Sequence, residues 1–189
     1  MEKVKIRQAT VKDAEQIVEI AKSLKYDPSK EQEEGFLVYV LDYDGYRSRI
    51  KRNLYFYVAE SDSQIDGFLM SYDDITLRIL DGCYAMNHQA GLARFLFSKD
   101  APFIFTDQIG VKRETNRSGI GRALMNRLFQ DMRTAKIPQV YGGILHEPTR
   151  NEASIAFCTG LGFEYVQEVQ NPDFYRWGVY RKLVDRGER

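Results

Sequence analysis

The chain has 189 residues, the length of one domain, and its 43% hydrophobic and 29% charged residues are the proportions of a folded globular protein. Lysine plus arginine and aspartate plus glutamate each total 27, so the net charge is zero, which argues against a general nucleic-acid binder. The two cysteines, Cys83 and Cys158, cannot form a disulfide framework, and with two histidines they show no zinc-site spacing, so we expect no metal. The N-terminus lacks an apolar signal region and no apolar run could span a membrane, so we expect a cytoplasmic protein with no membrane partner.

The first half of the chain predicts strands that alternate with helices. A short strand at Val4–Arg7 precedes a helix that opens at Thr10 and has one apolar face. A second helical stretch is expected between residues 32 and 52. The segments Leu54–Ala59 and Ile65–Tyr72 read as strands on either side of a polar turn, which predicts a hairpin.

The second half continues this alternation. Residues 75–101 give weak signals, although Ala90–Phe97 could be helical. Further strands are expected at Pro102–Val111, Gln139–Leu145, Phe163–Val169 and Trp177–Val184, and helices at Gly119–Arg133 and Asn151–Leu161. Asn151 is a candidate N-cap and Gly162 a candidate C-terminal glycine. This order predicts an α/β fold, more specifically a mixed α+β sheet flanked by helices, in a single domain over residues 1–189.

The junction before the helix at 119–133 has the features of a phosphate site. Gly119 and Gly121 lack Cβ atoms where backbone N–H groups could approach an anion, and the helix N-terminus adds donors and partial positive charge. The cations near this point are Lys112, Arg113, Arg117 and Arg122. A Walker loop would need Gly-Lys-Ser/Thr here, and Leu124 stands where a dinucleotide fingerprint needs a small residue. The alternatives left by these residues are a different phosphate ligand or a helix start that binds nothing.

The segment Asn116–Gly121 resembles the cofactor signature Gln/Arg-x-x-Gly-x-Gly/Ala of the GNAT superfamily, the acetyl-CoA-dependent N-acetyltransferases, although Asn116 replaces Gln or Arg at its first position. The segment Asn151–Phe163 is similar to the family's Asn-x-x-Ala/Ser-x-x-Phe-Tyr-x-x-x-Gly-Phe segment. The opening Ile6–Asp13 resembles the family's first strand and helix. The similarity spans a core of about residues 4–184.

The resemblance implies a GNAT-like fold, a mostly antiparallel mixed sheet that splays in a V between the 102–111 and 139–145 strands and holds acetyl-CoA as co-substrate. Its pyrophosphate would be bound by the backbone of Asn116, Arg117, Ser118, Gly119, Ile120, Gly121 and Arg122. The backbone of Ile109, Gly110 and Val111 would pair with the pantetheine arm. The Val111 N–H would act as an oxyanion donor, and Asn151 would contact the pantetheine, in addition to any capping role.

The resemblance also implies direct attack of an amine on the thioester in a ternary complex, with the enzyme mainly positioning the reactants. The attacking amine must be neutral, so a base is needed. The candidates are Asp107 on the cofactor strand, and His146 and Glu147, which we expect just past the 139–145 strand. His146 suits the task because an ordinary imidazole titrates near neutral pH, and the alternative is a surface loop residue.

A proton donor for the leaving thiolate is harder to assign. In this family a tyrosine usually serves, and Cys158 takes its place here. A thiol could donate a proton, but cysteine is also a common small core residue. Tyr141 and Tyr165 are further donors without positional support. The departures at Asn116 and Cys158 sustain a second hypothesis, a non-catalytic acyl-CoA sensor, and a third is a mononucleotide binder.

The acceptor is expected to be a primary amine of a small molecule or a peptide. In this family it is selected by regions that correspond here to residues 26–46 and 75–101. Candidate cleft residues are Tyr39, Tyr43, Tyr46, Asp42 and Asp44. They could receive a cationic amine, or they could be a core stripe with a solvated acidic edge. The resemblance also allows a homodimer.

Overall fold

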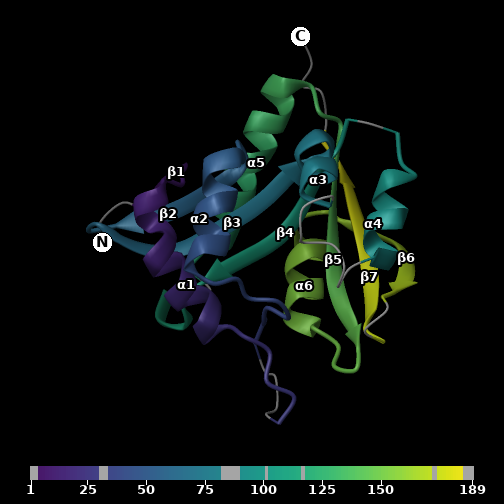
Figure 1. Ribbon diagram of the computed structural model, residues 1–189, viewed down its shortest axis with the longest axis horizontal. Coiled ribbons are helices and arrows are strands. Elements are labelled where there is room, and N and C mark those ends of the chain that lie inside the picture. Colours follow the sequence, from purple (N-terminus) through teal and green to yellow (C-terminus); the bar gives the residue numbers. More distant parts are fainter. Residues whose placement is uncertain are drawn as a thin grey trace. The chain divides into compact units, whose positions relative to one another are not determined.

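The computed structural model describes residues 4–29, 34–81, 90–100, 102–115, 118–171 and 174–184. The chain divides into two compact units, which comprise Met1–Asp27, Phe36–Ser71 and Gln108–Asp131 in the first, and Pro28–Gly35, Tyr72–Asp107 and Met132–Arg189 in the second. The strands form a seven-stranded sheet in the order β1-β2-β3-β4-β5-β7-β6 (Figure 1). No helix within the described ranges is long and apolar enough to cross a membrane.

The first unit contains the N-terminal helices and the strands that precede the glycine-containing helix start at residue 119. Its elements are β1 (Lys5–Gln8), a 3-10 turn (Val11–Asp13), α1 (Ala14–Ser23), α2 (Tyr43–Arg52), β2 (Phe56–Ser61), most of β3 (Gln64–Asp73), the end of β4 (Ile104–Val111), a 3-10 turn (Arg113–Thr115) and most of α5 (Ile120–Ala135). The predicted hairpin is confirmed, because β2 and β3 pair antiparallel from Phe56↔Met70 to Ser61↔Gln64. Its two turn residues, Asp62 and Ser63, both have positive φ angles, as the tight turns that suit twisted strands require.

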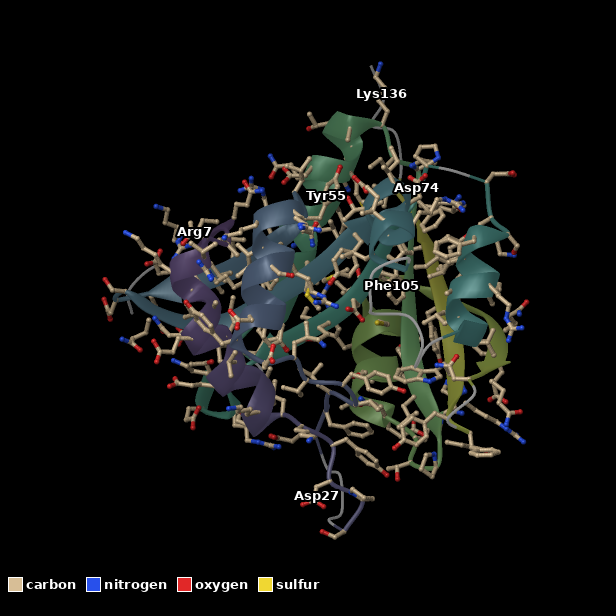
Figure 2. The ribbon with its side chains drawn as sticks, viewed as in Figure 1. Arg7, Asp27, Tyr55, Asp74, Phe105 and Lys136 are labelled. Carbon is tan, nitrogen blue, oxygen red and sulfur yellow. The ribbon has the colours of Figure 1, made fainter. Side chains whose placement is uncertain are left out.

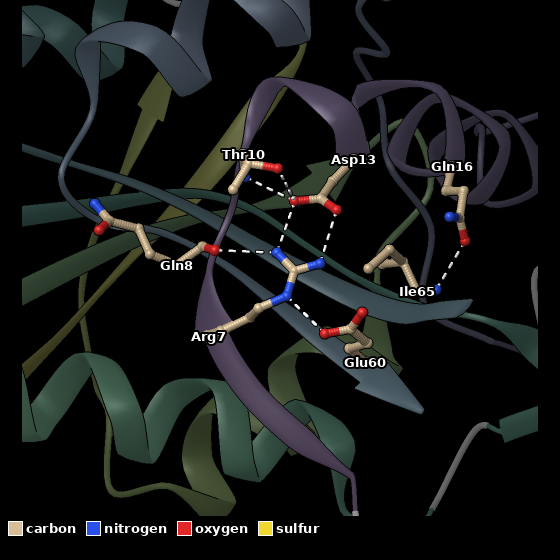
Figure 3. A network of polar contacts seen from close by, with 7 residues as sticks. All are labelled: Arg7, Gln8, Thr10, Asp13, Gln16, Glu60 and Ile65. Carbon is tan, nitrogen blue, oxygen red and sulfur yellow. Dashed lines mark hydrogen bonds and ion pairs between the residues drawn. The ribbon is translucent and has the colours of Figure 1, made fainter. Parts of the chain in front are cut away.

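An ion network fixes β1 to the start of the first helical segment (Figure 3). The Arg7 guanidinium donates to both carboxylate oxygens of Asp13 at 2.8 Å and to Glu60 at 2.7 Å. Asp13 in turn accepts from the backbone N–H and the hydroxyl of Thr10, a capping box at the predicted helix start. Burial by itself would raise the pKa of Asp13, but the bonds from Arg7 and Thr10 outweigh it and hold that pKa below its ordinary value.

The second unit contains the other half of the strand order. Its elements are α3 (Asp74–Asp81), α4 (Ala90–Phe97), the start of β4, β5 (Gln139–Glu147), α6 (Glu152–Gly160), β6 (Glu164–Gln170) and β7 (Arg176–Leu183). Phe105 on β4 is 2% exposed and belongs to the buried core of this unit (Figure 2). Phe95 and Phe103 both pack edge-to-face on Tyr141, which also donates its hydroxyl to Gln139. Tyr141 is therefore a core residue, which does not support it as a proton donor.

The helices α5 and α6 are each followed by a residue in the left-handed conformation, which closes the last turn. After α6, Gly162 has a φ of 82°, and Phe163 N–H donates to Cys158 C=O, which confirms the predicted C-terminal glycine. After α5 the same hydrogen-bond pattern is closed by Lys136, whose φ is 57° and whose exposed side chain points away from the helix (Figure 2). The chain therefore turns sharply after each helix, from α5 into β5 and from α6 into β6.

The mixed sheet flanked by helices is confirmed. β4 and β5 are parallel over Ile104–Thr106 with Val140–Gly142, whereas the β1–β2, β2–β3, β5–β7 and β6–β7 pairs are antiparallel. The helix α3, which runs directly on from β3, was not expected from the sequence. The splay of the sheet and the single-domain organisation stay predictions.

Candidate functional site

The N-terminus of α5 has the geometry of an anion site. Gly119 takes a φ of 89°, a left-handed conformation that favours glycine, and its C=O accepts the first helical bond from Ala123 N–H at 2.9 Å. A Cβ built on Gly119 would meet no atom of the described residues within 4 Å, apart from its two chain neighbours, so among these residues this corner of the backbone is open. The N–H groups of Ile120 and Gly121 start the helix and have no acceptor within it. They therefore offer donors and the positive end of the helix dipole to an anion.

Two of the four cations that the sequence places around this N-terminus, Lys112 and Arg113, contact other protein groups. Lys112 pairs with Asp66, with 3.6 Å between Nζ and Oδ1, and its N–H also donates to Asp66 C=O. Arg113 reaches back to Ser23 C=O at 3.3 Å. Arg122 is exposed on the first turn of α5, while Asn116 and Arg117 lie outside the described residues. The backbone of the α5 N-terminus, rather than a ring of side-chain charge, is thus the stronger feature.

The strand that leads to this helix is held by close glycine packing. A Cβ on Gly67 of β3 would lie 2.9 Å from Gly110 C=O and 3.0 Å from Ile120 Cγ2. A Cβ on Gly110 would lie 2.7 Å from Phe68 and 3.0 Å from Leu24. The face of Gly110 where a Cβ would stand therefore packs against the protein core, which leaves no room for a side chain. Ile109 and Val111, half-buried, alternate with the buried Gln108 and Gly110 along β4.

Gln108 is a polar core residue of the first unit that the sequence reading did not single out. It accepts from the Tyr46 hydroxyl at 2.7 Å and donates to Tyr39 C=O at 2.8 Å, so it ties α2 and the preceding loop to β4. This arrangement fits a core stripe better than a cleft for a cationic amine. Tyr46 is fully buried and packs edge-to-face on Phe68, whereas Tyr43 is 47% exposed.

The acidic residues of α2 also face solvent. Asp42 caps the helix by accepting from Gly45 N–H at 2.8 Å, and Asp44 is exposed near Arg47. The buried charge on this helix is the cation Arg49, 7% exposed, whose contact within the described part of the chain is Gly45 C=O at 3.3 Å. No buried carboxylate of α2 is therefore placed to receive a cationic amine.

His146 is not in a loop past the strand, as the sequence suggested, but within β5 and 8% exposed. The pairing of β5 with β7 shifts between Leu145 and Glu147, so His146 is the extra residue of a β-bulge. Bulges re-aim a side chain locally, and the sequence shows no signal for this one because it depends on the register with a distant strand.

The His146 ring lies in a polar and aromatic setting. Its Nδ1 is 3.3 Å from Glu168 Oε2, and its Nε2 is 3.2 Å from the Tyr180 hydroxyl. Tyr165 stacks on the ring at 5.9 Å between centroids. Opposite the ring, a Cβ on Gly178 would overlap the imidazole, so glycine at 178 is what makes room for it. This placement rules out the reading of His146 as a surface loop residue.

The other predicted residues of the second unit have structural partners. Glu147 pairs with Arg176 at 3.3 Å. Asn151 caps α6 as predicted, by accepting from Ser154 N–H at 3.2 Å, and it is 5% exposed. Cys158 is half-buried, and desolvation by burial raises the pKa of its thiol to about 12. Such a thiol is a weaker acid than an ordinary thiol, which favours the core interpretation of Cys158. Asp107 is half-buried on β4.

Among the described residues, no group of three or more histidine, cysteine, aspartate and glutamate side chains is arranged to hold a metal ion. The polar groups gathered at the α5 N-terminus and on β5–β7–β6 can bind an anion and move protons, respectively.

Comparison with known proteins identifies the family. The sequence model of the acetyltransferase (GNAT) family matches residues 15–163, most of the chain. The chain therefore belongs to this family of acyltransferases. No curated protein sequence matches the chain significantly.

Solved structures share the fold. The chain is similar to Naa20 of Chaetomium thermophilum in complex with a bisubstrate analogue, at a TM-score of 0.68 and 18% identity over 97% of this chain and 88% of that one. It is also similar to yncA of Salmonella typhimurium, a putative acetyltransferase with its cofactor acetyl-CoA, at 0.65 and 19% over 100% and 98%. A third similar structure is the ribosomal-protein-S18-alanine N-acetyltransferase of Escherichia coli, at 0.64 and 12% over 99% and 97%.

Proposed function

We propose that this GNAT protein transfers the acetyl group of acetyl-CoA to a primary amine of a small molecule or a peptide. The observation that carries the proposal is the N-terminus of α5, where Gly119 holds the backbone open and the first N–H groups of the helix have no acceptor within it. The structure of yncA with acetyl-CoA supports the choice of ligand, and the S18-alanine N-acetyltransferase supports an amine acceptor.

In the first unit, the backbone of residues 116–122 binds the pyrophosphate of acetyl-CoA. The backbone of Ile109–Val111 pairs with the pantetheine arm, and Val111 N–H donates to the acetyl carbonyl oxygen as negative charge develops on it. The close packing of Gly67 against Gly110 and Ile120 supports this assignment, because it couples the strand to the helix start and fixes the donors in advance. A contact between Asn151 and the pantetheine arm stays a prediction.

In the second unit, His146 takes part in deprotonating the acceptor. Its burial, its bulge and its two polar partners distinguish it from Glu147, which is exposed and paired with Arg176. Cys158 is given no part in proton transfer, because its half-buried thiol is a weaker acid than an ordinary thiol and forms little thiolate at neutral pH. A cytoplasmic location and a homodimer remain part of the proposal.

The experiment that tests this function measures binding and turnover separately. Titration calorimetry with acetyl-CoA is expected to show binding that coenzyme A shares and ATP does not. A thiol-release assay over a panel of small amines and peptide N-termini is expected to show acetyl transfer, with the acetylated product identified by mass spectrometry. Binding with no transfer to any amine would favour the acyl-CoA sensor, and binding of ATP alone would favour a mononucleotide binder.

A further inference from the structure

Asp66 on β3 is a buried carboxylate at an irregular point of the sheet. The pairing of β2 with β3 shifts register between Ala59 and Glu60, and Asp66 is the extra residue on β3, a β-bulge. Bulges re-aim the groups of the strand that carries them. Asp66 is 8% exposed, and its carboxylate accepts from the hydroxyl of Ser61 at the end of β2. The bulge is therefore fixed to the neighbouring strand by a side-chain contact.

The other contacts of Asp66 reach the end of β4. Asp66 C=O accepts from Lys112 N–H at 2.8 Å, and Asp66 Oδ1 lies 3.6 Å from Lys112 Nζ. Lys112 directly follows Val111, the last residue of β4. One residue of β3 thus holds both the main chain and the side chain of Lys112, at the point where the strand ends and the approach to α5 begins.

The bond from Lys112 N–H sets the direction of the amide before it. In a strand, the N–H groups of successive residues point to opposite edges. Because Lys112 N–H points to β3, the N–H of Val111 points to the other edge of β4. The described pairing of β4 with β5 on that edge covers Ile104–Thr106 and ends before Val111. The Val111 N–H is therefore directed to an edge where it can meet the proposed pantetheine arm.

The next residue of β3 packs on the same junction. A Cβ on Gly67 would lie 2.9 Å from Gly110 C=O and 3.0 Å from Ile120 Cγ2. It would also lie 3.3 Å from Val111 Cγ2. All of these residues, with Asp66, belong to the first unit. Two consecutive residues of β3 thus contact the end of β4 and the start of α5, which fixes the two relative to one another.

We propose that Asp66 is a positioning residue for acetyl transfer, which aims the Val111 N–H at the acetyl carbonyl oxygen by holding Lys112. The inference rests on the proposed function, in which this N–H stabilises the negative charge that develops on that oxygen. A donor fixed in advance does not have to reorient during the reaction, so its position affects the chemical step more than the affinity for the cofactor. Asp66 itself touches no reactant and exchanges no proton. No sequence motif indicated a role for it.

Two substitutions distinguish an effect of position from an effect of charge. Asp66→Asn removes a negative charge near the proposed diphosphate site, and Lys112→Met removes a positive one. By charge alone, coenzyme A should bind Asp66→Asn more tightly and Lys112→Met more weakly, which titration calorimetry measures. Loss of positioning acts in the same direction in both, so each should lower kcat, by roughly 10-fold. This loss is smaller than the roughly 100-fold or more expected when an oxyanion donor is removed.

Further variants test whether the two side chains act through one contact. Asp66→Asn/Lys112→Met should lower kcat no further than the larger single loss, because both changes break the same contact. Lys112→Arg keeps the cation and should retain most of kcat. Wild-type kcat in Asp66→Asn, or changes in kcat of opposite sign in Asp66→Asn and Lys112→Met, would overturn the proposal.

A matched pair of controls lies on α5 in the same unit. Asp131 also accepts from a hydroxyl, that of Tyr57 at 2.8 Å, and also pairs with a cation, Arg127 at 3.0 Å. Asp131→Asn and Arg127→Met are therefore expected to perturb a similar set of contacts while they retain wild-type kcat. Urea titrations of all variants report their stability. A loss of kcat in Asp131→Asn equal to that in Asp66→Asn would overturn the specific role of Asp66.

Amide hydrogen exchange followed by NMR tests the orientation of the two amides without any turnover. Lys112 N–H, which is bonded to Asp66 C=O, is expected to exchange slowly, and Val111 N–H faster. Acetyl-CoA should slow exchange at Val111, and Asp66→Asn should speed exchange at Lys112. Slower exchange at Val111 than at Lys112 without ligand, or exchange at Lys112 that is indifferent to Asp66→Asn, would overturn the proposal even if acetyl transfer is observed. The expected exchange pattern in a protein that acetylates no amine would instead contradict the proposed function.

Discussion

A comparison of Gly119→Glu with Gly119→Gln tests the effect of a negative charge at the proposed pyrophosphate site, because the two side chains have the same size and shape. A Cβ at this position meets no atom of the described residues within 4 Å, its chain neighbours aside. Any side chain pays the same penalty for the φ of 89°, on the order of 1–2 kcal/mol of stability. Gly119→Glu and Gly119→Gln therefore differ in little besides one negative charge beside the N–H groups of Ile120 and Gly121.

The expected loss of binding free energy for coenzyme A follows from the added charge alone. One unit charge about 5 Å from another costs roughly 1–3 kcal/mol when the effective dielectric constant lies between about 80 and 20. Coenzyme A is therefore expected to bind Gly119→Glu roughly 5- to 150-fold more weakly than Gly119→Gln. The gap should narrow as salt is raised, because exposed charges are screened.

Titration calorimetry with coenzyme A measures this gap directly. Pantetheine, which lacks the diphosphate, serves as the control ligand, and its affinity for the two variants should be the same. Equal coenzyme A affinities in Gly119→Glu and Gly119→Gln at low salt would refute the placement of the diphosphate at the start of α5.

Three further predictions concern charges and the thiol. Arg7→Met should lower the free energy of unfolding by about 2–3 kcal/mol in urea titrations, because it leaves Asp13 buried without its cation; the contribution of Asp13 itself should be present above about pH 4 and lost as pH falls below its lowered pKa. The free energy of unfolding of Arg49→Met should stay within about 1 kcal/mol of the wild type or exceed it, since no carboxylate among the described residues pairs with Arg49; a loss as large as that of Arg7→Met would contradict this expectation. Cys158→Ala should retain most of kcat in the thiol-release assay, whereas loss of a true proton donor would cost roughly 100-fold or more.

Local signals in the sequence predicted most of the fold. The polar turn at 61–64 gave the β2–β3 hairpin, and Asn151 and Gly162 marked the two ends of α6 correctly. The helix α3 was not predicted because β3 continues into it without a loop. Asp73 does cap this helix, by accepting from Thr76 N–H. These outcomes agree with the local nature of turns and caps, which a few neighbouring residues determine.

The site on β5–β7–β6 could be predicted only in part, because its geometry is set by contacts between residues far apart in the chain. His146 was identified by type, but its strand position depends on a register shift against β7. Its partners Glu168 and Tyr180 lie 22 and 34 residues away, and no local pattern connects them. Gln108 was overlooked for the same reason, since its partner Tyr46 is 62 residues distant.

The claim on which the account rests is that the backbone amides at the start of α5, from the preceding Gly119 to Gly121, bind the diphosphate of coenzyme A. Selective ¹⁵N labelling of glycine, with Gly119 and Gly121 assigned by substitution, allows these two N–H signals to be followed while coenzyme A is added. We predict that both shift strongly and saturate together with binding, and that pantetheine leaves them in place. Saturated binding of coenzyme A with both signals unmoved would contradict the account.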